Sequence, residues 1–202
     1  MLSTQQNTRE VVKLIGDIQQ EIARQMSKNH PAVTHYMSKY GYIPLWVLVN
    51  VLTLGKITTF YKLMKPSDKT VVAKTFGVQP DELHKYMSMC VLARNKCAHD
   101  ERFFDISFKQ SLHTKSIFNF KCLNIPRGAN FSFLSGTNDA FCVAIIFAVL
   151  LGSPDSDEFV SAMQLAFEKL SSQLHTVSVG DVMEVMGFNC AWTNLPHLSR
   201  PK

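Results

Sequence analysis

The chain has 202 residues, of which 46% are hydrophobic and 18% are charged, so it can bury a core and is not a disordered chain. Its longest strongly apolar run, residues 140–151, is shorter than the roughly 20 residues of a membrane-spanning helix, and its polar N-terminus lacks the pattern of a secretory signal, so we expect a cytoplasmic protein without membrane contact. The net charge of +5 is the sum of +9 in residues 1–130 and −4 in residues 131–202. The basic part could bind a polyanion such as a nucleic acid, although many basic surfaces only keep a protein soluble.

The first part of the chain reads as a series of helices separated by proline and glycine. Pro31 and Gly41 are placed to begin and end a short helix, and Gly55 predicts a break after an almost entirely apolar segment. Apolar residues recur at helical spacing before and after these breaks. Five helices are therefore predicted, over residues 4–28, 31–39, 45–54, 56–64 and 68–76.

A longer helix is predicted from Pro80 to about His99, because proline and two carboxylates occupy its first turn. At about 100° per residue, one apolar arc includes Leu83, Tyr86, Met87, Cys90, Ala93 and Cys97. Arg94 falls inside the same arc. Because burying an unpaired arginine costs several kcal/mol, we expect Arg94 to meet an acid, to reach a water-filled groove or to lie at a subunit interface.

The second half of the chain is less regular. Residues 105–137 show little periodicity and predict a short helix followed by a loop. Asn138 or Asp139 could cap a buried helix that ends at Leu151, and Asp155 could cap an amphipathic helix to about Thr176. A last short helix from Ser178 to Gly187 would belong to a C-terminal appendage, residues 177–202. No segment alternates as a strand does, so we predict an all-α helical bundle with a single domain over residues 1–202.

Common catalytic signatures are not found. The sequence contains no phosphate-binding loop, no dinucleotide fingerprint, no nucleophile elbow and no zinc-protease motif. Five scattered cysteines are expected to be buried, reduced thiols, and no metal site or cofactor is implied. These residues are Cys90, Cys97, Cys122, Cys142 and Cys190.

The most informative segment is the hexapeptide from Arg94 to His99, which reads Arg-Asn-Lys-Cys-Ala-His. It combines a permanent cation with a group that exchanges protons near neutral pH, the pair that metal-free RNA cleavage requires. Asn95 and His99 are one helical turn apart and share a face. Arg94 and His99 differ by about 140° and about 7.5 Å along the helix, so the arginine side chain must wrap round the helix end to reach a common site.

Two segments resemble a known family. His30-Pro31, His35-Tyr36, Tyr40-Gly41, the run Ile43 to Val49, Leu54-Gly55 and Phe60-Tyr61 resemble the centre of Abi-like abortive-infection proteins, and Leu92 to His99 with Arg102-Phe103-Phe104 resembles their Arg-Asn-x-x-Ala-His signature. The resemblance covers residues 29–105 most closely. It implies the HEPN superfamily of helical bundles, often homodimeric, in which the motifs of two protomers meet and cleave RNA without a metal.

The resemblance implies a metal-independent endoribonuclease of bacterial anti-phage defence, with RNA as its substrate. His99 would transfer protons, Arg94 would clamp the phosphate, and Asn95 would orient either the imidazole or the phosphate. Lys96 and Arg102 are candidate RNA contacts, although an ion pair of Arg102 with Glu101 or Asp105 is as plausible.

Two other interpretations stay open. The chain could be a non-catalytic RNA- or protein-binding bundle of a toxin–antitoxin-like defence system, and in either case an antitoxin RNA or protein could restrain it. An enzyme that uses Cys97 is disfavoured, because that thiol is predicted to lie on the core arc of its helix.

Overall fold

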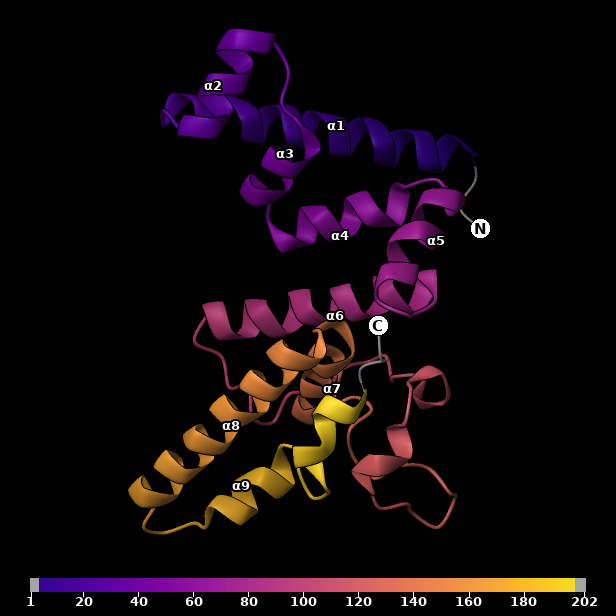
Figure 1. Cartoon of the computed structure of the whole chain (residues 1–202), viewed down its shortest axis with the longest axis vertical. Coiled ribbons are helices and arrows are strands. Elements are labelled where there is room, and N and C mark those ends of the chain that lie inside the picture. The colour runs from indigo at the N-terminus through magenta and orange to yellow at the C-terminus, as the bar shows by residue number, and fades with distance from the viewer. Residues whose placement is uncertain (1–3, 199–202) are drawn as a thin grey trace. The chain divides into compact units, whose positions relative to one another are not determined.

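Residues 4–198 of the chain are described in a computed structural model (Figure 1). The described residues form helices connected by loops, with one isolated β-bridge between Arg127 and Phe133 and no strand, which confirms the all-α prediction. Their contacts fall into two compact units, Met1–Val71 and Val72–Lys202. The single domain expected from the sequence stays a prediction.

The first unit is built from four complete helices and the start of a fifth. The longest, α1, contacts α2, α3 and α4. Their bounds are α1 (Thr4–Ser27), α2 (Pro31–Tyr40), α3 (Leu45–Val51), α4 (Leu54–Leu63) and α5 (Pro66–Thr75). The break predicted at Gly55 lies before Leu54 instead, because the Thr53 hydroxyl accepts a hydrogen bond from the Lys56 amide at 3.3 Å and caps α4.

Polar contacts connect the helices of the first unit. Lys62 of α4 forms an ion pair with Glu10 of α1 at 2.9 Å, and Lys56 donates to the Asp17 carbonyl at 3.3 Å. On α1 itself, the Arg24 guanidinium donates to the buried Glu21 carboxylate and lowers the pKa of that carboxyl. Among residues 7–71, the buried apolar side chains are those of Leu14, Val33, Val47, Leu52 and Tyr61.

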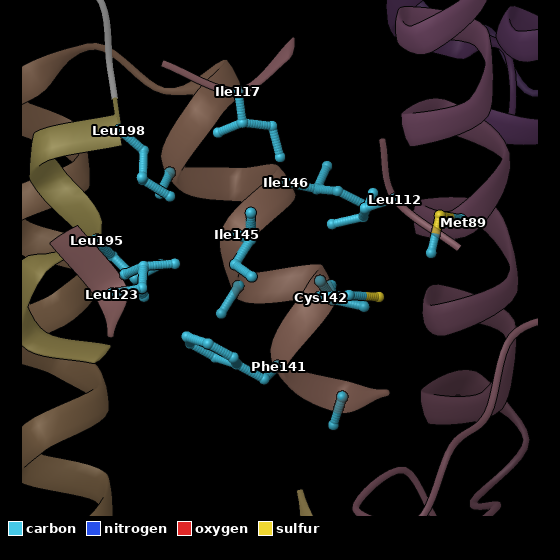
Figure 2. Packing of buried hydrophobic residues seen from close by; sticks show 14 of the residues in the cluster. Met89, Leu112, Ile117, Leu123, Phe141, Cys142, Ile145, Ile146, Leu195 and Leu198 are labelled. Atoms are coloured by element: carbon cyan, nitrogen blue, oxygen red, sulfur yellow. The ribbon is translucent and has the colours of Figure 1, made fainter. Parts of the chain in front are cut away.

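The second unit surrounds the apolar helix α7. It contains α6 (Pro80–Ala98), α7 (Ala140–Leu150), α8 (Ser153–Gln173) and α9 (Val179–Val185), with short 3₁₀ segments η1 (Thr114–Ser116), η2 (Phe120–Leu123) and η3 (Trp192–Leu198). Asp139 caps α7 by accepting from the Cys142 amide at 3.0 Å, as predicted. Figure 2 shows α7 between Met89 of α6 on one side and Leu195 and Leu198 of η3 on the other.

Three parts of the second unit differ from the prediction. Helix α8 begins at Ser153 with Gly152 as its N-cap, so Asp155 lies in its first turn and does not cap it. The segment expected to be an appendage contributes to the core, since Leu195 and Leu198 are completely buried. Residues 105–137 contain no α-helix; they form two 3₁₀ turns, and left-handed residues Asn119 and Asn124 flank the second. Isolated apolar residues of this segment still pack against α7, so its packing is tertiary and does not follow a local period.

Among residues 4–198, no helix combines the length and the apolar character that crossing a lipid bilayer demands.

Candidate functional site

The candidate site lies on the last turns of α6. This helix begins with a capping box, in which the Glu82 carboxylate accepts from the Gln79 amide at 3.2 Å. Its buried stripe consists of Leu83, Tyr86, Met89 and Ala93. Beyond Ala93 the stripe stops, so the final turn extends past the core and most of its side chains are exposed.

Arg94 is exposed, so the prediction that it lies on the core face is wrong. The buried stripe is narrower than the predicted arc, and Arg94 points about 90° away from its centre. The guanidinium donates to Asn95 Oδ1 at 3.3 Å. Within residues 4–198, no carboxylate lies at ion-pairing distance from Arg94.

The three motif side chains share the outward half of the helix. On an ideal α-helix, Arg94, Asn95 and His99 lie within an arc of about 140° that faces away from the buried stripe. All three are exposed. The side-chain hydrogen bond of Asn95 connects it to Arg94, and none to His99 is seen in the described part of the chain.

His99 occupies the C-terminal cap of α6. Its amide donates to the Asn95 carbonyl at 3.1 Å, and the Glu101 amide returns to the Lys96 carbonyl at 3.0 Å. This is the pattern of a Schellman motif, which places the residue between them in the left-handed region. That residue is Asp100, with φ of 54°, where glycine is the usual choice.

Two other cations, one within the motif and one just after it, form ion pairs. Lys96 pairs with Glu101 at 3.3 Å, and Arg102 pairs with Asp105 at 3.7 Å, so the ion-pair alternative for Arg102 is the one seen. Both pairs are exposed and contribute little to stability, and a phosphate could displace either carboxylate. Arg94 is therefore the cation of the motif that is ready to bind an anion.

A groove of about 590 Å³ runs beside the motif. The chain after α6 turns back along this helix. A hydrogen bond from the Lys85 ammonium of α6 to the Ser111 carbonyl connects the returning segment to the helix. The groove has an apolar floor and a polar rim, lined by Ser88, Met89, Leu92, Asn95, Lys96, Glu101, Ile106, Ser107, Phe108, Lys109 and Gln110. On an ideal helix, His99 lies one turn beyond Asn95 on the side that faces this groove.

Sequence reasoning missed the far wall of the groove. Lys109 and Gln110 come from a segment without periodicity, and no local pattern marks them as neighbours of α6. Their position depends on backbone contacts far along the chain, in which Phe108 and Leu112 donate to the carbonyls of Asn138 and Thr137 at 2.7 and 2.8 Å.

Cys142 is buried, Cys97 is exposed, and Cys90, Cys122 and Cys190 are half-buried. Desolvation raises the pKa of Cys90 to about 11, that of Cys190 to about 12 and also that of Cys142, so these three thiols are poor nucleophiles. Cys97 is exposed, which corrects its predicted place on the core arc. In the described range, no three His, Cys, Asp or Glu side chains are grouped to hold a metal ion.

A model of the family of Abi-like proteins matches residues 2–105. The match includes α1, so it extends the resemblance seen at residues 29–105, and it ends just after the Arg94–His99 motif. Neither the curated proteins nor the solved structures contain a significant match to the chain. Because the family model covers half of its length, the chain belongs to the Abi-like protein family, and this membership suggests a role in abortive-infection defence.

Proposed function

We propose that this protein is a metal-independent endoribonuclease of anti-phage defence, with a HEPN-type site formed by Arg94, Asn95 and His99. The observation that supports the proposal most is the arrangement of the last turns of α6: three exposed polar side chains on one half of the helix, with Arg94 free of any carboxylate in the described part of the chain. The Arg94 guanidinium is therefore available to an anionic ligand such as a phosphate.

The chemistry needs no metal, because RNA carries its own nucleophile. The His99 imidazole removes the proton of a ribose 2′-hydroxyl, whose oxygen attacks the adjacent phosphorus. Arg94 donates two hydrogen bonds to the non-bridging oxygens, where negative charge grows in the transition state. The 5′-oxygen leaves with a proton from a second acid. The products are a 2′,3′-cyclic phosphate and a 5′-hydroxyl.

The second acid is the reason to propose a homodimer. One histidine cannot remove one proton and deliver another in the same step, whereas a two-fold axis near the motif brings a second His99 to the same phosphate. An exposed apolar side chain close to the motif in the sequence supports this arrangement, since Phe104 is 42% exposed and a second copy would cover it.

The groove provides a place for the nucleotide next to the scissile phosphate. Its volume suits a base and ribose, and its apolar floor with amide groups on the rim is typical of a small-ligand site. Lys96 and Lys109 at its rim would contact the flanking phosphates after Glu101 is displaced. Arg102 would contribute in the same way once released from Asp105.

Cleavage of labelled RNA in the presence of a chelator tests the proposal. His99→Ala and Arg94→Ala should each lower the cleavage rate about 10²- to 10⁴-fold, while His175→Ala, another exposed histidine of the second unit, should not. Arg94→Lys keeps the charge but loses the bidentate geometry, so its rate should be intermediate. Cleavage that needs a divalent cation, or that survives both alanine substitutions, contradicts the proposal.

The dimer is tested by dilution. If the site needs two copies, the cleavage rate per protein molecule should fall when the concentration drops below the dissociation constant measured by sedimentation. A rate per molecule that stays constant in a monomeric sample would show that one copy is sufficient.

One observation favours a non-catalytic binding module instead. Arg94 and His99 lie at opposite edges of their arc, about 140° apart, so a single copy does not direct both at one phosphate. A gel-shift assay separates the two functions. Binding that is equal in wild type and His99→Ala, without cleavage by either protein, would identify a module that holds RNA or a partner. An antitoxin RNA or protein could restrain such a module.

A further inference from the structure

The first unit carries a largely exposed group of aromatic rings on α2, α3 and the turn between them, which we name the aromatic patch. It consists of His35, Tyr36, Tyr40, Tyr42 and Trp46. The centroids of Tyr36 and Tyr40 are 5.7 Å apart, and Tyr36 meets Trp46 edge to face at 5.6 Å. Tyr40, Tyr42 and Trp46 are 48%, 62% and 60% exposed. Exposed rings in such a continuous group are unusual on a protein surface.

Local backbone geometry presents these rings to solvent. Gly41 ends α2 in the left-handed region, with φ of 73°, and Pro44 precedes the first residue of α3. Tyr40 and Tyr42 therefore lie on either side of a tight turn, and their rings are 6.2 Å apart. Despite these edge-on and tilted contacts, more than half of the Tyr42 and Trp46 surface stays exposed, whereas the Lys39 ammonium lies over the Tyr40 ring.

The segment that carries the aromatic patch contains cations and no carboxylate. No Asp or Glu occurs between Glu21 and Asp68, a stretch that includes α2, α3 and α4. Lys39 lies 5.1 Å from the centroid of the Tyr40 ring. Single-stranded nucleic acid has bases that stack on aromatic rings and phosphates that attract cations. A surface with exposed aromatic rings and lysines, on a segment without carboxylates, is complementary to it.

The size of the aromatic patch argues against a stable protein interface. At about 200 Å² per ring, the exposed parts of Tyr40, Tyr42 and Trp46 amount to roughly 350 Å², well below the roughly 800 Å² that each partner of a stable complex buries. Stacking of a few bases needs no larger area.

We propose that the aromatic patch binds unpaired bases of single-stranded RNA by stacking, with Lys39 on the adjacent phosphate, as a contact separate from the Arg94–His99 motif. The identity of the ligand rests on the proposed function. The existence of the contact does not, because binding can be measured without cleavage.

Trp46 allows stacking to be measured directly. The chain has two tryptophans, so Trp192→Phe leaves Trp46 as the only one, and His99→Ala prevents cleavage. In this double variant of the full chain, a short oligouridylate should quench the Trp46 fluorescence saturably. Inorganic polyphosphate, which has the charge without the bases, should not quench it.

Substitutions then test the contribution of the rings. In the His99→Ala background, Trp46→Ala and Tyr42→Ala should each weaken oligouridylate binding roughly fivefold or more, measured by fluorescence anisotropy. Phe118→Ala, which removes an exposed ring of the second unit, is the matched control and should leave affinity unchanged. Lys39→Gln should lower the salt dependence of log K by about 0.7 per log unit of salt.

Three outcomes would overturn the inference. The first is the absence of quenching, and the second is equal quenching by polyphosphate. The third is self-association that Trp46→Ala abolishes while oligouridylate affinity stays unchanged, which would make the aromatic patch a contact between copies of the chain. None of these outcomes bears on catalysis, and a wild-type protein that stacks RNA without cutting it would refute only the nuclease.

Discussion

The two units differ in the share of their apolar side chains that they bury. Among the residues whose burial is described, the first unit (7–71) buries five of them and leaves nine large ones exposed, whereas the second (72–152 and 154–198) buries 24 and exposes ten. Helix length is one cause, because α2, α3 and α4 have ten residues or fewer, while α7 is enclosed by α6, η3 and the loop segments around it. The second unit therefore packs one face of α6 against an extensive core, and the first leaves a larger share of its apolar side chains on the surface.

A substitution in each core should show this difference most strongly. Phe141→Ala, in the second unit, should lower the free energy of unfolding by about 3–5 kcal/mol, and Val47→Ala, in the first, by about 2 kcal/mol. Each unit contains one tryptophan, so urea unfolding of Trp46→Phe and Trp192→Phe variants follows the two units separately. If both probes shift equally for both core substitutions, the units unfold together as the single domain predicted from the sequence.

A second prediction compares two glycines. Gly187 has φ of 88°, and a Cβ there would collide with the Asp139 carboxylate, which caps α7 and accepts from the Gly136 amide at 2.7 Å. Gly187→Ala should therefore destabilise the second unit by about 2–3 kcal/mol. The control is Gly16→Ala on α1, where a Cβ meets open space and should stabilise the first unit by up to about 1 kcal/mol. Thermal unfolding with the two tryptophan probes measures both effects.

Gly187 also illustrates which features of the fold could be predicted from the sequence alone. Helix caps are local signals, so the ends at Gly41, Asp139 and Gly187 were predictable. The burial of η3 and the path of residues 101–111 were not, because they depend on contacts between segments distant in the chain.

The same distinction holds at the candidate site. The hexapeptide identified its residues, but whether Arg94 faces the core or solvent depends on where the core ends along α6. Ideal helical geometry cannot provide that information.

Carboxylates of the two units should respond to pH in opposite directions. The pKa of Glu21 is lowered by hydrogen bonds from Arg24. Its contribution to the free energy of unfolding is therefore complete above pH 4.5 and is lost as pH falls through the folded-state pKa. The pKa of Asp139 is raised by burial, so the native state holds that proton more tightly, and stability is lost as pH rises from 3.8 through the folded-state value.

Glu21→Gln and Asp139→Asn test this contrast. The stability of wild type relative to Glu21→Gln should decrease on acidification, and the stability relative to Asp139→Asn should increase, each reported by the tryptophan of its own unit. Two slopes of the same sign would show that the assignment of one carboxylate is wrong.

The smallest expected effect compares two helix ends. α2 ends with Gly41 in the left-handed region, whereas α6 ends with Asp100 in the same region, with a carboxylate at the negative end of the helix dipole. Asp100→Gly should raise the stability of the second unit by about 0.5–1 kcal/mol, and Gly41→Ala should lower that of the first by about 1 kcal/mol. Urea midpoints of the two tryptophan probes measure both changes. A loss of stability in Asp100→Gly would mean that this carboxylate makes a contact that outweighs its backbone strain. Because Asp100 adjoins His99, a simultaneous change in the pH profile of RNA cleavage would identify that contact as one with the His99 imidazole.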